Sequence, residues 1–210
     1  MNVRELIIPG CFEFVPIQHG DKRGIFLEWY HAERFAAAVG HQLTLAQANH
    51  SVSSRGTLRG VHYALVPPGQ GKYVYCPRGA VLDVVVDLRL GSPTFGRSDA
   101  CRLDDVDRRA LYVPEGVGHS FMALTDDSSL TYLCTTGYNP DREKAVNALD
   151  PALGLAWPSD IDPVLSERDR AAPTVAEAER EGLLPSYEAC LARYADLRDP
   201  PQARLGSNGQ

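Results

Sequence analysis

Short apolar segments, broken at close intervals by turn residues, are the feature that most restricts the fold of this chain. They run through residues 1–140 and are separated by stretches rich in Gly, Pro and Asp, such as PPGQG, RLGSPTFG and PEGVG. Many short strands with turns of this kind predict a sandwich, jelly roll or barrel. The segment LDVVVDL (82–88) is β-branched and apolar, as expected of a strand that is buried on both faces.

Helical spacing of apolar residues occurs in two places. One helix is predicted over residues 31–39, and a second over residues 175–197 with Thr174 as its N-cap. The last segment, DPPQARLGSNGQ, has the composition of a disordered terminus. The predicted organisation is a β domain over 1–175, a helical extension of the same domain over 176–198, and a disordered tail over 199–210.

Charge and cysteine usage exclude several classes of protein. The 210 residues carry a net charge of -6, which disfavours a general nucleic-acid binder. No apolar run approaches the roughly 20 residues that cross a bilayer, and the N-terminus lacks the long apolar stretch of a signal peptide. The five cysteines are scattered and form no CxxC pair. We therefore expect a cytoplasmic protein without a membrane or nucleic-acid partner.

His62, in the segment TLRGVHYALVPP, is the first candidate for chemistry. On a regular strand Arg59 and His62 point to opposite faces. A bulge at Gly60 would turn both toward one cavity, and we take such a bulge as an assumption. For His62 considered alone, a half-buried histidine that fills space and bonds to the backbone is the more common interpretation.

His119 stands in the spacing Pro-x-Gly-x-x-His, which resembles the second sequence motif of cupins. Many cupins bind a metal there and take further ligands from a His-x-His pair, but His62 is followed only by Tyr63 and Ala64. A catalytic metal site needs about three protein ligands. The sequence therefore predicts no metal site, and His119 is interpreted as a substrate contact or pocket wall, with a plain turn histidine as the alternative.

Three other side chains are ordinary when taken singly. Tyr132 and Tyr138, in LTYLCTTGYNP, are aromatic residues within and at the end of a predicted strand, where core packing is the usual role. Asp169, in LSERDRAAP, is by itself a solvated surface carboxylate.

Several stretches in the same order make the chain similar to the dTDP-4-dehydrorhamnose 3,5-epimerase family. The resemblance implies a mainly β, cupin-like jelly-roll sandwich that acts as a homodimer without metal or organic cofactor. It also implies a dTDP-4-keto-6-deoxyhexose as substrate. The stretches cover nearly all of residues 12–175 and are DKRGIFLEWY, LAQANHSVSSRGTLRGVHY, PPGQGKYVYCPRGAVLDVVVDLRLGSPTFG, LYVPEGVGHSF, LTYLCTTGYNPDREKAVNALDPALGLAWP and LSERDRAAP.

The resemblance also implies roles for individual residues. His62 is expected to be the general base, oriented by Asp169, and Tyr132 the acid that returns a proton from the other face. Lys72 is expected to stabilise the enolate. The remaining positions are expected to contact the substrate, chiefly its nucleotide and diphosphate: Arg23, Glu28, Gln47, Asn49, Arg59, His119 and Glu143, with a basic residue at Arg168 and a platform for the thymine ring at Tyr138.

The expected chemistry suits these residue types. A ketone at carbon 4 acidifies the protons on carbons 3 and 5, and a base that titrates near neutrality, as imidazole does, can remove one of them. The enolate oxygen then needs a positive donor in a dry pocket. Inversion requires a second group that delivers a proton to the opposite face of the ring.

The chain departs from the family pattern at Ser120, where Gly is frequent, and at Gly71, where Ala is common. Both departures concern the shape of the pocket. Some members of the family invert both carbons and others only carbon 3 or only carbon 5, so a 3-only epimerase of an antibiotic-sugar pathway is one alternative. A metal-dependent cupin and a nucleotide-sugar-binding module without turnover are the others.

Overall fold

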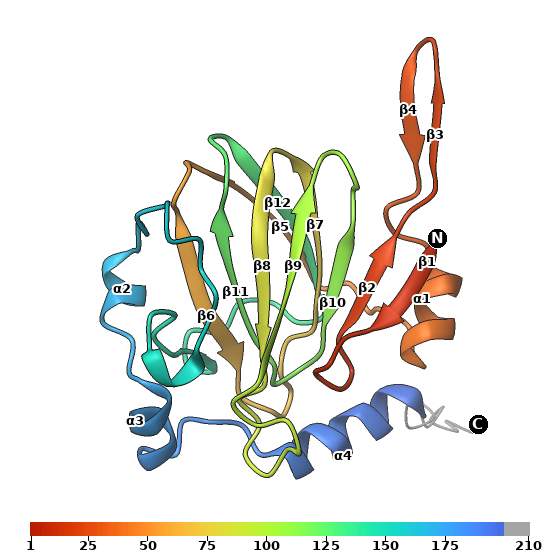
Figure 1. The fold of residues 1–210 in the computed structure, drawn as a ribbon. Helices are drawn as coiled ribbons and strands as arrows, with labels where there is room; N and C mark the ends of the chain where they lie inside the picture. The colour runs from red at the N-terminus through yellow and green to blue at the C-terminus, as the bar shows by residue number, and fades with distance from the viewer. Residues whose placement is uncertain (200–210) are drawn as a thin grey trace, which may run out of the picture.

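Two antiparallel sheets face each other across an apolar interior in the computed structural model, which describes residues 1–199 (Figure 1). The larger sheet has the strand order β1-β2-β10-β7-β12-β5, and the smaller has the order β13-β6-β11-β8-β9. A separate hairpin, β3–β4, projects beyond the sheets (Figure 1). This arrangement confirms the predicted jelly-roll sandwich with a C-terminal helical segment.

The strands are β1 Asn2–Glu5, β2 Phe12–Val15, β3 Gln18–Asp21, β4 Gly24–Leu27, β5 Gln47–Ser53, β6 Leu58–Ala64, β7 Lys72–Arg78, β8 Ala80–Val86, β9 Ser98–Asp104, β10 Ala110–Val113, β11 Gly118–Ala123, β12 Ser128–Cys134 and β13 Glu143–Ala145. The helices are α1 Ala32–Val39, η1 Pro151–Leu153, α2 Glu167–Arg170, α3 Val175–Arg180 and α4 Tyr187–Arg198.

Strand β8 shows why the first part of the chain folds as two layers. Val81 and Val85 point into the inter-sheet core, where they meet Val74 of the larger sheet. Val84 and Val86 point the other way, into a second core beneath the C-terminal segments. Alternate residues of a strand face opposite sides, so an uninterrupted apolar run is needed here. The prediction of a strand buried on both faces is confirmed.

The predicted first helix is confirmed as α1, which buries Phe35 against the outer face of the larger sheet. The prediction of one helix over residues 175–197 is wrong, because α3 and α4 are separate. Gly182, with φ of +66°, and Pro185 lie between them. Proline has no N–H to donate, and a left-handed residue ends a helix.

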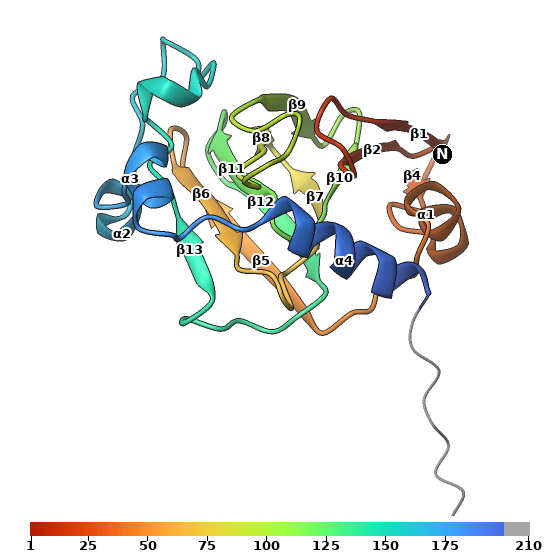
Figure 2. The same ribbon diagram turned by 90° about the horizontal axis from the view of Figure 1, so that it is seen from below.

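Thr174 caps α3 as predicted, and Glu177 completes a capping box. Helix α4 lies across one end of the sandwich and reaches toward α1 (Figure 2). Residues 200–210, nearly all of the predicted tail, lie outside the described residues. Within residues 1–199, no helix combines the length and apolar character needed to cross a membrane.

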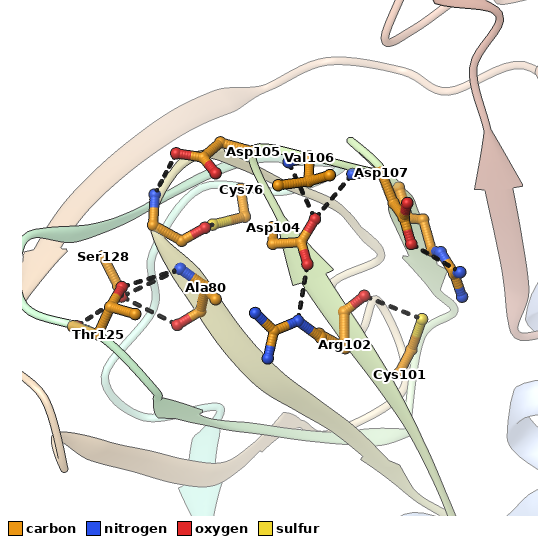
Figure 3. Close-up of polar contacts among 12 residues, drawn as sticks. Cys76, Ala80, Cys101, Arg102, Asp104, Asp105, Val106, Asp107, Thr125 and Ser128 are labelled. Atoms are coloured by element: carbon orange, nitrogen blue, oxygen red, sulfur yellow. Dashed lines mark hydrogen bonds and ion pairs between the residues drawn. The ribbon is translucent and has the colours of Figure 1, made fainter.

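Polar contacts join the turns that follow β7, β9 and β11 at one end of the sandwich (Figure 3). Asp104 accepts the N–H groups of Val106 and Asp107 at 3.0 and 2.8 Å, which closes the turn after β9. The Ser128 hydroxyl donates to the carbonyl of Ala80 at 2.9 Å. These hydrogen bonds hold the turns after β7 and β9, at the opposite end of β7 from Lys72.

Candidate active site

A bulge in β6 turns Arg59 and His62 to the same side of the smaller sheet. His119 of β11 pairs with His62, whereas Phe121, two residues further, pairs with Arg59, three residues back. The extra residue on β6 resets the alternation of faces. Gly60 permits this, since its φ is +107° and an added Cβ would lie 2.5 Å from the His119 carbonyl oxygen. The assumption of a bulge at Gly60 is confirmed.

His62 and Asp169 form a close pair, although 107 residues separate them in the sequence. His62 Nε2 lies 2.6 Å from Asp169 Oδ1, with the imidazole 31% exposed and the carboxylate 6% exposed. The Ser166 hydroxyl caps α2 by accepting the Asp169 N–H at 3.0 Å. Burial tends to raise the pKa of Asp169, but hydrogen bonds with His62 and Ser166 hold it below its ordinary value. Asp169 is therefore a carboxylate at neutral pH.

A second histidine–aspartate pair lies beside the first. His119, the cross-strand partner of His62, has its Nε2 2.8 and 2.9 Å from the two carboxylate oxygens of Asp83. Asp83 is fully buried on β8. Sequence reasoning missed Asp83, but an aspartate in the middle of the apolar segment AVLDVVV is itself a signal, because a buried carboxylate requires a partner.

Lys72 and Tyr132 lie on the facing wall, in the larger sheet. Lys72 shares a strand face with Val74 of the inter-sheet core, and Tyr132 pairs with Val74 and packs against that core. Burial lowers the pKa of Lys72, an effect opposed by nearby Cys134 and Glu143. Burial raises the pKa of Tyr132. The two groups therefore shift in opposite directions from their ordinary values.

Gln47, Asn49, Tyr138 and Glu143 gather at one side of this interior. Gln47 donates to Asn49 Oδ1 at 2.7 Å and accepts the N–H of Tyr138 at 2.9 Å. Asn49 is the cross-strand neighbour of Tyr132. Tyr138 and Glu143 line a cavity of about 280 Å³. The side chains expected to hold a nucleotide are thus adjacent to the expected catalytic groups.

Three predicted site residues are not brought into this cluster. Arg23, 84% exposed, lies near the tip of the β3–β4 hairpin and pairs with Asp21. Glu28 is exposed and directly follows β4, the second strand of the hairpin. Arg168 is exposed on α2, next to Asp169, at the rim.

Among residues 1–199, no three His, Cys, Asp or Glu side chains are grouped so that they could hold a metal ion. Each of the two histidines at the site instead has an aspartate as its partner.

A jelly roll whose two sheets face each other across histidine–aspartate pairs on one wall and Lys72 and Tyr132 on the other defines a cupin-like enzyme. The sequence profile of dTDP-4-dehydrorhamnose 3,5-epimerases matches residues 5–177. The chain belongs to this family of sugar-nucleotide epimerases, which confirms the resemblance noted in the sequence.

Three relatives illustrate the similarity. The dTDP-4-dehydrorhamnose 3-epimerase of Streptomyces niveus is 55% identical over 209 residues, which cover 100% of each chain. The Mycobacterium tuberculosis rmlC epimerase superposes with a TM-score of 0.92 at 50% identity, covering 94% of this chain and 100% of that one. ChmJ, a 3'-monoepimerase from Streptomyces bikiniensis solved with dTDP-quinovose, gives a TM-score of 0.90 at 52% identity, covering 92% and 98%.

Proposed function

We propose that the protein epimerises a dTDP-4-keto-6-deoxyhexose by removing and returning a proton beside the ketone, without a cofactor. One observation carries the proposal: His62, paired with Asp169 of α2, belongs to the smaller sheet, Lys72 and Tyr132 belong to the larger sheet, and all of them face one interior. A sugar ring held between the sheets would meet a base on one face and an acid on the other. Carbon 3 is the position named for the Streptomyces niveus enzyme and for ChmJ, and carbon 5 is the second candidate.

In this mechanism His62 takes the proton from carbon 3. Its Nε2–H donates to the Asp169 carboxylate, which leaves Nδ1 free to accept the proton. The carboxylate then stabilises the imidazolium. As the C–H bond breaks, its electron pair moves into the C3–C4 bond and the ketone oxygen becomes an enolate, opposite the Lys72 ammonium. The Tyr132 hydroxyl delivers a proton to carbon 3 from the other face, and solvent restores both groups.

The nucleotide half of the substrate accounts for the other side chains. We assign the diphosphate to Arg59, with Arg168 at the rim, because guanidinium and phosphate form paired hydrogen bonds. The flat face of thymine suits stacking on the exposed ring of Tyr138, beside Gln47, Asn49 and Glu143. His119, fixed by Asp83, is assigned to the wall that the sugar and phosphates contact.

A homodimer in the cytoplasm is part of the same proposal. The hairpin that carries Arg23, with Glu28 just beyond it, also exposes Ile25 and Phe26. β5 leaves one edge of the larger sheet unpaired and exposes Val52. Exposed apolar side chains and unpaired sheet edges favour association with a second copy, in which Arg23 and Glu28 would reach the partner's substrate.

The test is proton NMR of dTDP-4-keto-6-deoxyglucose incubated with the purified protein in deuterium oxide, with no metal added. Deuterium at carbon 3 alone means a mono-epimerase of the antibiotic-sugar type, and deuterium at carbons 3 and 5 means a double epimerase. Uptake at neither carbon refutes the proposal and favours a nucleotide-sugar-binding module or a metal-dependent cupin. In the control, His62→Ala should abolish uptake while dTDP still binds.

A further inference from the structure

Glu115 is a fully buried carboxylate that the proposed reaction does not use. It lies in the turn between β10 and β11. Its Oε1 accepts a hydrogen bond from the Thr135 hydroxyl at 2.9 Å. Its carboxyl group also interacts with the hydroxyl of Tyr112 on β10. Burying a carboxyl group costs free energy, so the position has a cost that packing alone does not explain.

The hydrogen bond with Thr135 connects Glu115 to the end of β12 and, through Gly71, to the start of β7. Thr135 directly follows β12, and its hydroxyl oxygen accepts the N–H of Gly71 at 2.7 Å. The N–H of Thr135 donates to the Gly71 carbonyl at 3.0 Å. Lys72 is the next residue and begins β7. The sequence of contacts Glu115–Thr135–Gly71 therefore holds the peptide from which the Lys72 side chain extends.

Packing leaves this carboxylate little freedom to move. A Cβ added at Gly69 would lie 2.6 Å from the Glu115 Cβ, and one added at Gly71 would lie 3.2 Å from Glu115 Oε1. On the other side, the Tyr194 hydroxyl of α4 donates to the backbone carbonyl of Glu115. A displacement of Glu115 would therefore be transmitted to the 69–71 loop.

We propose that Glu115 is a positioning residue for Lys72, acting through the Thr135 hydroxyl and the Gly71 peptide. The inference rests on the role assigned to Lys72 under the proposed function.

The proposed action of Glu115 is geometric, because it runs through the hydrogen bonds that join its carboxyl group to Thr135 and Thr135 to the Gly71 peptide. A glutamine at position 115 keeps an oxygen that can accept the Thr135 hydrogen bond, whereas a methionine keeps the size of the side chain and loses the acceptor.

The experiment compares Glu115→Met and Thr135→Val with the conservative variants Glu115→Gln and Thr135→Ser. We expect kcat for deuterium uptake to fall about tenfold in the first two, because a misplacement of about 1 Å can cost roughly 100-fold and the shift expected here is smaller. Affinity for dTDP should stay unchanged in all four, and Glu115→Gln and Thr135→Ser should keep a wild-type pH profile. The double variant Glu115→Met/Thr135→Val should be no slower than either single variant.

Glu13→Gln is the matched control, because Glu13 is also a buried glutamate but bonds to Arg4 and Arg109. It should lower the unfolding temperature without lowering kcat. Equal losses in Glu115→Gln and Glu115→Met, or multiplying losses in the double variant, would overturn the inference. Lys72→Ala, assayed in parallel, separates the two proposals: if it keeps full uptake, the role of Lys72 fails, whereas a slow Lys72→Ala beside a normal Thr135→Val refutes only the positioning role.

Discussion

Replacing Asp169 with asparagine tests the histidine–aspartate pair directly. Asparagine keeps the size and the acceptor oxygen of the aspartate, so the 2.6 Å contact with His62 Nε2 can persist, but the negative charge is lost. A hydrogen bond to a charged group contributes about 1.5–3 kcal/mol. Since His62 is 31% exposed and partly screened by water, we expect a loss of about 2 kcal/mol in stabilisation of the imidazolium, or roughly a 30-fold slower proton abstraction.

The assay is the initial rate of deuterium uptake at carbon 3 under saturating substrate, with dTDP affinity measured alongside. Affinity should be unchanged, because the role proposed for Asp169 concerns His62 and not the nucleotide. An uptake rate close to that of the wild type, in a folded Asp169→Asn variant, would refute the reasoning.

The same variant predicts a pH dependence of stability. The pKa of Asp169 is lowered from its ordinary value of 3.8 in the folded state, so the folded state favours the carboxylate. The stabilising contribution is therefore complete above about pH 4 and is lost as the pH falls through the lower, folded-state pKa. Below about pH 4, the difference in free energy of unfolding between wild type and Asp169→Asn should shrink as the pH falls, and a difference that grows in that range would contradict the assignment.

Three further outcomes follow from the opposing walls of the site. Because burial lowers the pKa of Lys72 and raises that of Tyr132, the alkaline loss of activity should begin below pH 10.5 and move upward in Lys72→Arg; a limb that does not move would contradict this. In Tyr132→Phe, epimer formation should fall more than deuterium uptake, and equal losses in the two NMR signals would remove the role of proton donor. Asp83→Ala leaves His119 Nε2 without its partner and should lower the free energy of unfolding by about 1–3 kcal/mol, measured by urea denaturation; no loss would show that the pair contributes nothing to folding.

Local features of the chain predict much of the fold. Turn residues between short apolar segments predict the sandwich, because strand length and turn chemistry are encoded within a few neighbouring residues. The capping residue Thr174 is predicted for the same reason. The single helix over 175–197 is a wrong prediction because apolar spacing continues across Gly182 and Pro185, whereas the backbone does not. Gly182 and Pro185 are sufficient to indicate that the helix is interrupted, because glycine favours the left-handed conformation and proline lacks an N–H.

The site is less accessible to such reasoning, since its parts are joined by tertiary structure. Nothing local connects His62 with Asp169, which α2 places beside it, and only the family resemblance links them. Asp83 is visible in the sequence, because a carboxylate in the middle of the apolar segment of β8 is buried and therefore needs a partner. Arg23 and Glu28 are assigned by resemblance alone, and the hairpin keeps both away from His62 within one chain.

The proposed base, His62, and the proposed acid, Tyr132, belong to different sheets, and this separation has an evolutionary consequence. The distance between the sheets is set by apolar side chains packed between them, among them Val74, Val85 and Phe121. Adding or removing a methylene group there changes the gap across which His62 and Tyr132 face each other, without altering any residue that touches the sugar. We expect substitutions in this core to change the spacing between the proposed base and the proposed acid, and with it the fit of the sugar ring, while leaving the residues proposed to contact the sugar unchanged.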